Sequence, residues 1–276
     1  MSGTGSEIGN DQYLLIIGAM KCATTSLFSY LAEHPAICPA AVKEPEYFSN
    51  QVRVHDTRNR IAAYAELWDF DPDRHAWAME ASTGYTKHEE PEAPGRVAAH
   101  GLRPRLVYAV RDPFARIESH YNFMRRHPDW RLPITHPDLV QTSNYFAHAR
   151  AWTGLFGRDA LLIVDYDELI RTPLVTVNRV CAFLDIAPMH TIADSSARNV
   201  TRRPKSAPER ALRRAAPFLS RLPAGMKAPV RRVLEATRPQ PARLTPAERA
   251  AVAETLAPDM ARLHDGWGVD VARWGF

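Results

Sequence analysis

A hydrophobic strand that runs into a lysine-bearing turn and then into a helix constrains this chain more than any other feature. Residues 14–17 are apolar and end at Gly18, which permits a tight turn. Apolar residues recur at helical spacing from Leu27 onward. The unpaired N–H groups and the dipole of a helix start attract anions. The segment therefore predicts a phosphate-binding loop, with an ordinary strand–helix turn as the alternative. Its candidate ligands are Gly18, Lys21, Cys22, Ala23, Thr24, Thr25 and Ser26.

This loop differs from that of nucleotide triphosphatases. Their motif reads G-x-x-x-x-G-K-[ST], with the lysine directly before the hydroxyl residue. Here the lysine lies three residues after Gly18 and no second glycine follows. An apolar strand ending in Asp-x-x-Gly, which would supply a magnesium ligand, is also missing from the sequence. Triphosphate cleavage is therefore disfavoured.

A second apolar run ends in an arginine. Residues 105–110, RLVYAV, indicate a buried parallel strand, and Arg111, Asp112 and an amphipathic stretch through Ser119 follow it. Ligands of open α/β sheets bind beyond the carboxyl ends of the strands, and a guanidinium suits a phosphate. We predict a phosphate ligand in Arg111. The alternative is an ion pair with Asp112 or another carboxylate.

Three motifs together resemble the sulfotransferases that use 3′-phosphoadenosine 5′-phosphosulfate (PAPS), in the branch related to heparan sulfate sulfotransferases and bacterial sulfotransferases. They are GAMKCATTSL at 18–27, KEPEYF at 43–48 and VRDPFARIESHY at 110–121. The likeness extends from Tyr13 to Trp274. It implies a single α/β domain of the P-loop-like sulfotransferase fold, with a central parallel β-sheet flanked by helices.

The resemblance also implies where the donor binds. Residues 21–26 would hold the 5′-phosphosulfate, and Arg111 and Ser119 the 3′-phosphate. A loop carrying Arg198 and Arg202 would cover the donor. 3′-Phosphoadenosine 5′-phosphate (PAP) would be the product, and no metal is expected.

One loop position departs from the family pattern. The family usually has glycine where this chain has Ala23. If the position needs a positive φ, alanine costs about 1 kcal/mol. The loop must then avoid that conformation or absorb the strain.

Sulfuryl transfer needs a cation and a base. It proceeds through a loose in-line transition state comparable to that of phosphoryl transfer, so charge growing on the leaving phosphate needs a cation, for which Lys21 is the candidate. The acceptor must lose a proton. The resemblance assigns the base to Glu44, with Glu46 and His120 as alternatives.

The strand expected at residues 75–79 is followed by Glu80 and Ala81. Heparan-type relatives carry a lysine where this chain has Ala81, which argues against a highly sulfated polysaccharide acceptor. Two roles stay open for Glu80, a structural one and that of a second acidic group at the site. Ser82, Thr83 and Tyr85 at the same strand end are candidates for acceptor contacts.

The length of 276 residues fits one α/β domain. Strands are expected at 13–17, 75–79, 105–110 and 161–165, alternating with helices. We expect a disordered polar tail at 1–10 and a sulfotransferase domain at 11–276.

Residues 202–238 form a basic segment with eleven Lys/Arg against Glu209 and Glu235. It is interpreted as a solvated helical excursion or as a lid over the donor or an anionic acceptor. Membrane or nucleic-acid contact is a further alternative.

The remaining signals concern location and partners. The sequence shows no signal peptide and no apolar stretch long enough to span a membrane. Its three cysteines lack metal-ligand spacing. We expect a cytoplasmic, bacterial enzyme with a small-molecule or sugar acceptor and no nucleic-acid partner. The rival functions are a P-loop-type small-molecule kinase, which would depend on magnesium, and a nucleic-acid-binding module, whose affinity would fall steeply with salt.

Overall fold

The computed structural model describes residues 8–49, 64–127, 129–193 and 240–276. In these ranges a five-stranded parallel sheet has the order β2-β3-β1-β4-β5. Its strands are β1 (Tyr13–Gly18), β2 (Ile37–Pro39), β3 (Trp77–Ala81), β4 (Arg105–Val110) and β5 (Leu161–Asp165). The arrangement confirms the predicted α/β fold class.

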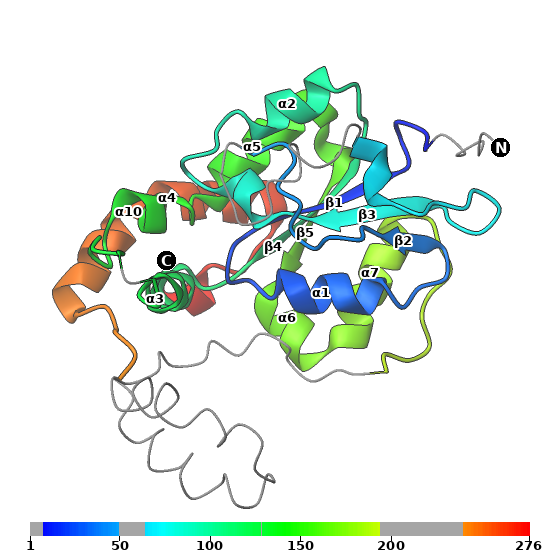
Figure 1. Cartoon of the computed structure of the whole chain (residues 1–276). Coiled ribbons are helices and arrows are strands. Elements are labelled where there is room, and N and C mark those ends of the chain that lie inside the picture. The colour runs from blue at the N-terminus through cyan, green and yellow to red at the C-terminus, as the bar shows by residue number, and fades with distance from the viewer. Residues whose placement is uncertain (1–7, 50–63, 128, 194–239) are drawn as a thin grey trace, which may run out of the picture.

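Helices cover both faces of the sheet. α1 (Thr24–Leu31), α6 (Tyr166–Arg171) and α7 (Pro173–Phe183) lie on one face, and α2 (Ala93–Ala99) and α5 (Tyr145–Phe156) on the other (Figure 1). Three more helices lie on this second side and past the carboxyl end of β4. They are α3 (Pro113–Met124), α4 (Pro137–Gln141) and α10 (Pro246–Trp267). None of the helices in the described ranges combines the length and the hydropathy that crossing a membrane requires.

The central strand β1 explains why both faces need covering. Leu14 and Ile16 belong to the hydrophobic cluster beneath α1, α6 and α7, whereas Leu15 and Ile17 belong to the cluster beneath α2, α5 and α10. All four side chains are fully buried. Because successive side chains of a strand point to opposite faces, a continuous apolar run is typical of a strand buried on both sides.

The strand order marks the carboxyl end of β1 as the point where a ligand is expected to bind. β3 pairs with one edge of β1 and β4 with the other, so the chain builds the two halves of the sheet on opposite sides of this strand. The carboxyl ends of parallel strands share one edge of the sheet, and ligands of such folds bind where the direction of building reverses. Gly18, Ala81 and Val110 end their strands at this edge.

Helix ends follow local sequence signals. Asp112 caps α3 by accepting a hydrogen bond from the Phe114 N–H at 2.9 Å. Thr245 and Glu248 form a capping box at the start of α10, and Gly268 ends that helix with a φ of 66°. These caps fix the helices that surround the carboxyl edge of the sheet.

Three expectations about the elements need correction. Strand β2 was not predicted, and the strand expected at 75–79 lies at Trp77–Ala81, because β3 takes its register from pairing with Ile37 and Tyr13. Residues 8–10, which were predicted to belong to the disordered tail 1–10, are part of the described structure. Ile8 is buried, and the Asn10 carbonyl accepts the Arg103 N–H at 2.7 Å. The basic segment 202–238, like Arg198 and Arg202, lies outside the described residues.

Candidate active site

The turn between β1 and α1 presents unsatisfied donors at the carboxyl edge of the sheet. Ala23 is the N-cap of α1 and no side chain caps the helix, so its first N–H groups lack intrahelical partners. The buried Ser26 Oγ has no hydrogen-bond partner among the described residues. Thr24 is also buried, and Thr25 is half-buried. This donor set fits an anionic group such as a phosphate.

The loop absorbs backbone strain instead of avoiding it. Ala23 has a φ of 61° and Lys21 a φ of 74°, a region in which each non-glycine residue costs on the order of 1–2 kcal/mol. Ala23 therefore takes the conformation for which the family's usual glycine is suited. Such strain is concentrated at functional sites.

Gly18 is required for a second reason besides the turn. Its φ is 145°, and a Cβ built there would lie 2.0 Å from Thr86 Oγ1. That hydroxyl donates to the Ile17 carbonyl at 3.1 Å, and the Ala19 N–H donates to the Ala109 carbonyl at 2.8 Å. The start of the loop is therefore fixed to β4 and to the segment after β3.

We predict that Gly18→Ala destabilises the fold by about 3 kcal/mol, because the side chain combines an unfavourable φ with a clash against Thr86. Chemical denaturation measures this difference. The matched control is Gly95→Ala in α2, where a Cβ meets no atom within 4 Å and helix propensity should add up to about 1 kcal/mol. Equal stability of Gly18→Ala and the wild type would contradict the prediction.

Lys21 lies in a cationic, partly apolar environment. Its Nζ is 4.6 Å from the centre of the Phe123 ring. The Arg126 guanidinium lies 5.3 Å from the centre of the same ring. Burial lowers the pKa of Lys21 to about 8, and Arg126 and Arg111 act in the same direction, whereas Glu44 raises it. Because Arg126 and Arg111 repel the charged Lys21 ammonium, a bound anion would stabilise this group of cations.

Arg111 joins Lys21 at this edge, as predicted. Its Nη1 donates to the Lys21 carbonyl at 3.2 Å, and its guanidinium lies 4.1 Å from the centre of the Tyr166 ring. The Tyr145 hydroxyl donates to the Arg111 carbonyl at 2.8 Å. The neighbouring carboxylate of Asp112 caps α3 instead of forming an ion pair with Arg111 within the described residues. Ser119 lies half-buried on α3, the helix that begins directly after this segment.

Glu44 approaches Lys21 from the loop that follows β2. Its charge acts on the pKa of Lys21, and its Oε1 forms an ion pair with Lys43 Nζ at 2.7 Å. The Glu44 side chain is 31% exposed, so a ligand can reach it. Its φ of 57° is again left-handed.

The two alternative bases are placed differently. Glu46 is buried, and its Oε1 accepts the Gly84 N–H at 2.9 Å. His120 is buried too, with Nδ1 3.2 Å from Nη1 of the fully buried Arg116. Both side chains are buried and have hydrogen-bond partners inside the protein. This supports the choice of the more exposed Glu44 as the base.

Cys22 is a packing residue. The thiol is fully buried, and burial raises its pKa to about 11 against the opposing effect of Arg116 and Arg111. Desolvation outweighs that charge because the thiol is removed from water.

Glu80 is buried beside the site. Its carboxylate accepts hydrogen bonds from the hydroxyls of Tyr64, Ser82 and Tyr85. Burial raises its pKa to about 7, while the same three donors act to lower it. Ser82 and Tyr85 thus have internal partners, which is contrary to the expectation that they contact an acceptor.

Sequence reasoning missed Arg126 and the aromatic rings that flank the cations. Arg126 follows α3, and its position near Lys21 depends on how that helix leaves the sheet. No local pattern signals it. Nor does any local pattern indicate that Tyr166 and Phe123 supply the rings next to Arg111 and Lys21.

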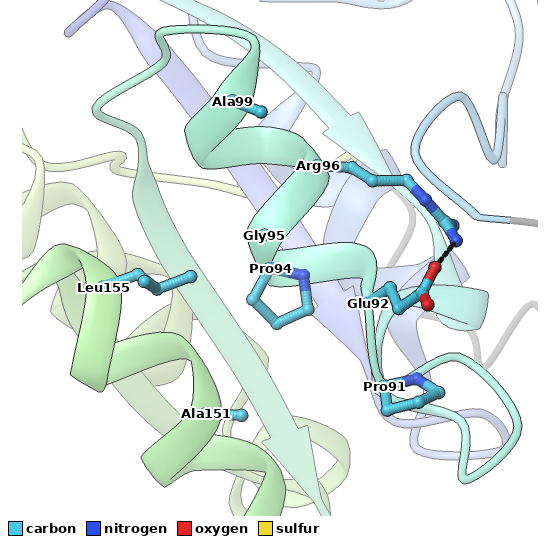
Figure 2. Close-up of a pocket in the computed structure, with 8 residues that line it drawn as sticks. All are labelled: Pro91, Glu92, Pro94, Gly95, Arg96, Ala99, Ala151 and Leu155. Carbon is cyan, nitrogen blue, oxygen red and sulfur yellow. Dashed lines mark hydrogen bonds and ion pairs between the residues drawn. The ribbon is translucent and has the colours of Figure 1, made fainter.

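A surface hollow of about 440 Å³ lies elsewhere, between α2 and α5 (Figure 2). Its lining includes Pro94, Ala151 and Leu155, and Arg96 pairs with Glu92 at its rim. It shares no residue with the predicted site.

Fold and site together define an α/β protein with an anion-binding loop at the carboxyl edge of a parallel sheet. Residues 11–220 match the family described as the sulfotransferase domain. The chain belongs to this family, which confirms the family predicted from the sequence.

Named relatives agree with this assignment. The chain is 25% identical over 204 residues to the bifunctional heparan sulfate N-deacetylase/N-sulfotransferase 4 of Mus musculus, a match that covers 66% of this chain and 23% of that protein. It is 28% identical over 191 residues to the heparan sulfate glucosamine 3-O-sulfotransferase 5 of Mus musculus, with 63% of this chain and 53% of that protein covered. The match thus spans less than a quarter of the first relative and about half of the second.

A solved structure shows the same fold. The sulfotransferase from Alicyclobacillus acidocaldarius is similar with a TM-score of 0.69 and 21% identity, over 98% of this chain and 100% of that one.

Proposed function

We propose that the chain transfers a sulfuryl group from PAPS to a hydroxyl or amine of a small-molecule or sugar acceptor. The observation that carries this proposal is the meeting of Lys21, Arg111 and Glu44 beside the uncapped start of α1. The family supports the choice of donor.

In this proposal the site holds the two anionic ends of the donor. Residues 21–26 would hold the 5′-phosphosulfate, since the buried Ser26 Oγ and the first N–H groups of α1 offer donors there. Arg111 and Ser119 would hold the 3′-phosphate. When bound, PAPS supplies the sulfuryl group and the phosphate from which it departs.

Lys21 and Glu44 divide the chemistry between them. The Lys21 ammonium stabilises the negative charge that grows on the leaving oxygen. The Glu44 carboxylate accepts the proton of the acceptor hydroxyl or amine. The transfer is direct and needs neither a covalent enzyme intermediate nor a metal.

We propose that the acceptor differs from heparan sulfate, which the names of the two relatives mention. Ala81, buried at the end of β3, stands where the resemblance places a lysine, which supports an acceptor other than a highly sulfated polysaccharide. We also propose a bacterial, cytoplasmic setting. The three cysteines support it, since all are buried free thiols, as is usual in a reducing compartment.

A donor-consumption assay tests the proposal. The protein is incubated with PAPS, a chelator and a panel of phenols, sugars and amines, and PAP release and acceptor mass are followed. We expect PAP release coupled to a sulfated product. PAPS left intact with every acceptor, together with magnesium-dependent turnover of ATP, would contradict it and favour the kinase alternative.

The pH dependence follows from Lys21. Its pKa of about 8 in the ligand-free protein means that the charge is present below that pH and is lost as the pH rises through it. We therefore predict that kcat/KM for the donor falls above about pH 8, because kcat/KM reports the groups of the free enzyme. A profile that stays flat from pH 7 to pH 10 would contradict this assignment.

A further inference from the structure

The buried Glu80 carboxylate collects three hydroxyl donors in one small space. Tyr64 and Tyr85 donate to its Oε1 at 2.5 and 2.8 Å, and Ser82 donates to its Oε2 at 2.5 Å. The Glu80 side chain is fully buried, as are Ser82 and Tyr85. A buried carboxylate surrounded in this way orients the hydroxyls that face it.

Two of these hydroxyls connect Glu80 to the loop that carries Glu44. The Glu46 N–H donates to Ser82 Oγ at 3.0 Å, and the Phe48 N–H donates to the Tyr85 hydroxyl at 3.3 Å. Each hydroxyl thus accepts from the loop backbone and donates to Glu80. Within the described residues, the third hydroxyl, from Tyr64, donates to Glu80 but makes no hydrogen bond to the loop backbone.

The loop that carries Glu44 makes further contacts, and its left-handed backbone conformations require them. Glu46 Oε1 accepts the Gly84 N–H at 2.9 Å, and Arg96 Nη1 donates to the Phe48 carbonyl at 2.9 Å. Both Glu44 and Glu46 have left-handed backbone conformations, with φ of 57° and 53°. Such conformations persist in non-glycine residues only where the surroundings impose them.

We propose that Glu80 is a positioning residue that sets the Glu44 loop against Lys21 through the hydroxyls of Ser82 and Tyr85. The inference rests on the proposed role of Glu44 as the base. It gives a function to a carboxylate that lies too deep in the protein to touch the acceptor. In its ionised form Glu80 presents only acceptor oxygens, so both hydroxyls donate to it and turn their own lone pairs toward the loop N–H groups.

Tyr85→Phe and Tyr64→Phe form a matched pair that tests the inference. Each removes one hydroxyl from Glu80 Oε1, but only the Tyr85 hydroxyl also accepts from the loop. We expect Tyr85→Phe to lower kcat about tenfold with the donor KM unchanged, since small displacements of a catalytic group are costly. Tyr64→Phe should stay within about twofold of the wild type. Equal effects of the two variants on kcat would overturn the inference.

A second measurement is independent of the chemistry. Amide hydrogen exchange at Phe48 should be faster in Tyr85→Phe than in Tyr64→Phe, and exchange at Glu46 should be faster in Ser82→Ala, which also covers the case in which Tyr85→Phe fails to fold. Unchanged amide exchange in these variants would overturn this inference and would leave the proposed function untouched.

A double-variant experiment separates the inference from the proposed base. If Glu80 acts through Glu44, Tyr85→Phe should lower kcat no further in a Glu44→Gln background. A full additional tenfold loss there would overturn the inference, while Glu44→Gln would still be slow. Full activity of Glu44→Gln by itself would instead refute the base, and with it the catalytic part of this inference.

Discussion

Glu44→Gln should lower kcat by about 10²–10⁴-fold while the affinity for PAP stays nearly unchanged. Glutamine keeps the shape of the side chain but cannot take up the acceptor proton. The donor site, formed by the loop after β1 and by Arg111, is built from other elements. The effect should therefore appear in the chemical step, which single-turnover measurements with saturating PAPS report.

The control for Glu44→Gln is the same substitution at Glu254, an exposed residue of α10. This variant should have wild-type turnover. Full activity in Glu44→Gln would assign the base to another group, and His120 would then be the first candidate to test.

Replacing Lys21 should reduce turnover by about 10²–10³-fold, the usual cost of removing one preorganised group that stabilises transition-state charge. Lys21→Met is the sharper variant, because it retains an unbranched side chain over the Phe123 ring and removes only the charge. Lys21→Ala removes both the packing and the charge. Turnover should fall in both variants to a similar extent.

Comparing the two variants separates the charge of Lys21 from its packing. If Lys21→Met keeps wild-type turnover and Lys21→Ala does not, the side chain acts by packing and the proposed electrostatic role is wrong. If both fall equally while thermal stability is unchanged, the charge carries the effect. Arg126, which lies across the same ring, cannot replace Lys21 in that case.

The elements at the centre of the sheet could be predicted because their signals are local. The β4 and β5 strands have the bounds that were predicted from their apolar runs, and α1 begins with the hydroxyl residues Thr24, Thr25 and Ser26. β2 has only three residues, Ile37–Pro39, too few for a periodic pattern. Its existence depends on pairing with β3, which the sequence does not display.

The site was predictable in its parts and less so in its arrangement. Motifs singled out Lys21, Arg111 and Glu44, and the fold brings these three together. The role of Glu80 could not be decided from sequence, because one of its partners, Tyr64, lies 16 residues away in the chain. Proximity of Arg126 to Lys21 likewise depends on the path of α3. Ser119 keeps its predicted role as a proposal.

The central claim is that one pocket holds both charged ends of the donor. Calorimetric titration with PAP tests it most directly, using the wild type, Arg111→Ala and Arg105→Ala. The last is a matched control, since Arg105 lies at the opposite end of the same strand, where its Nη1 donates to the Asp159 carbonyl. We predict one bound PAP in the wild type, an unchanged Kd in Arg105→Ala and a Kd raised by about 10–100-fold in Arg111→Ala, the range expected for a lost charge-assisted hydrogen bond. Equal affinity of Arg111→Ala and the wild type, or no binding of PAP to either, would contradict the account.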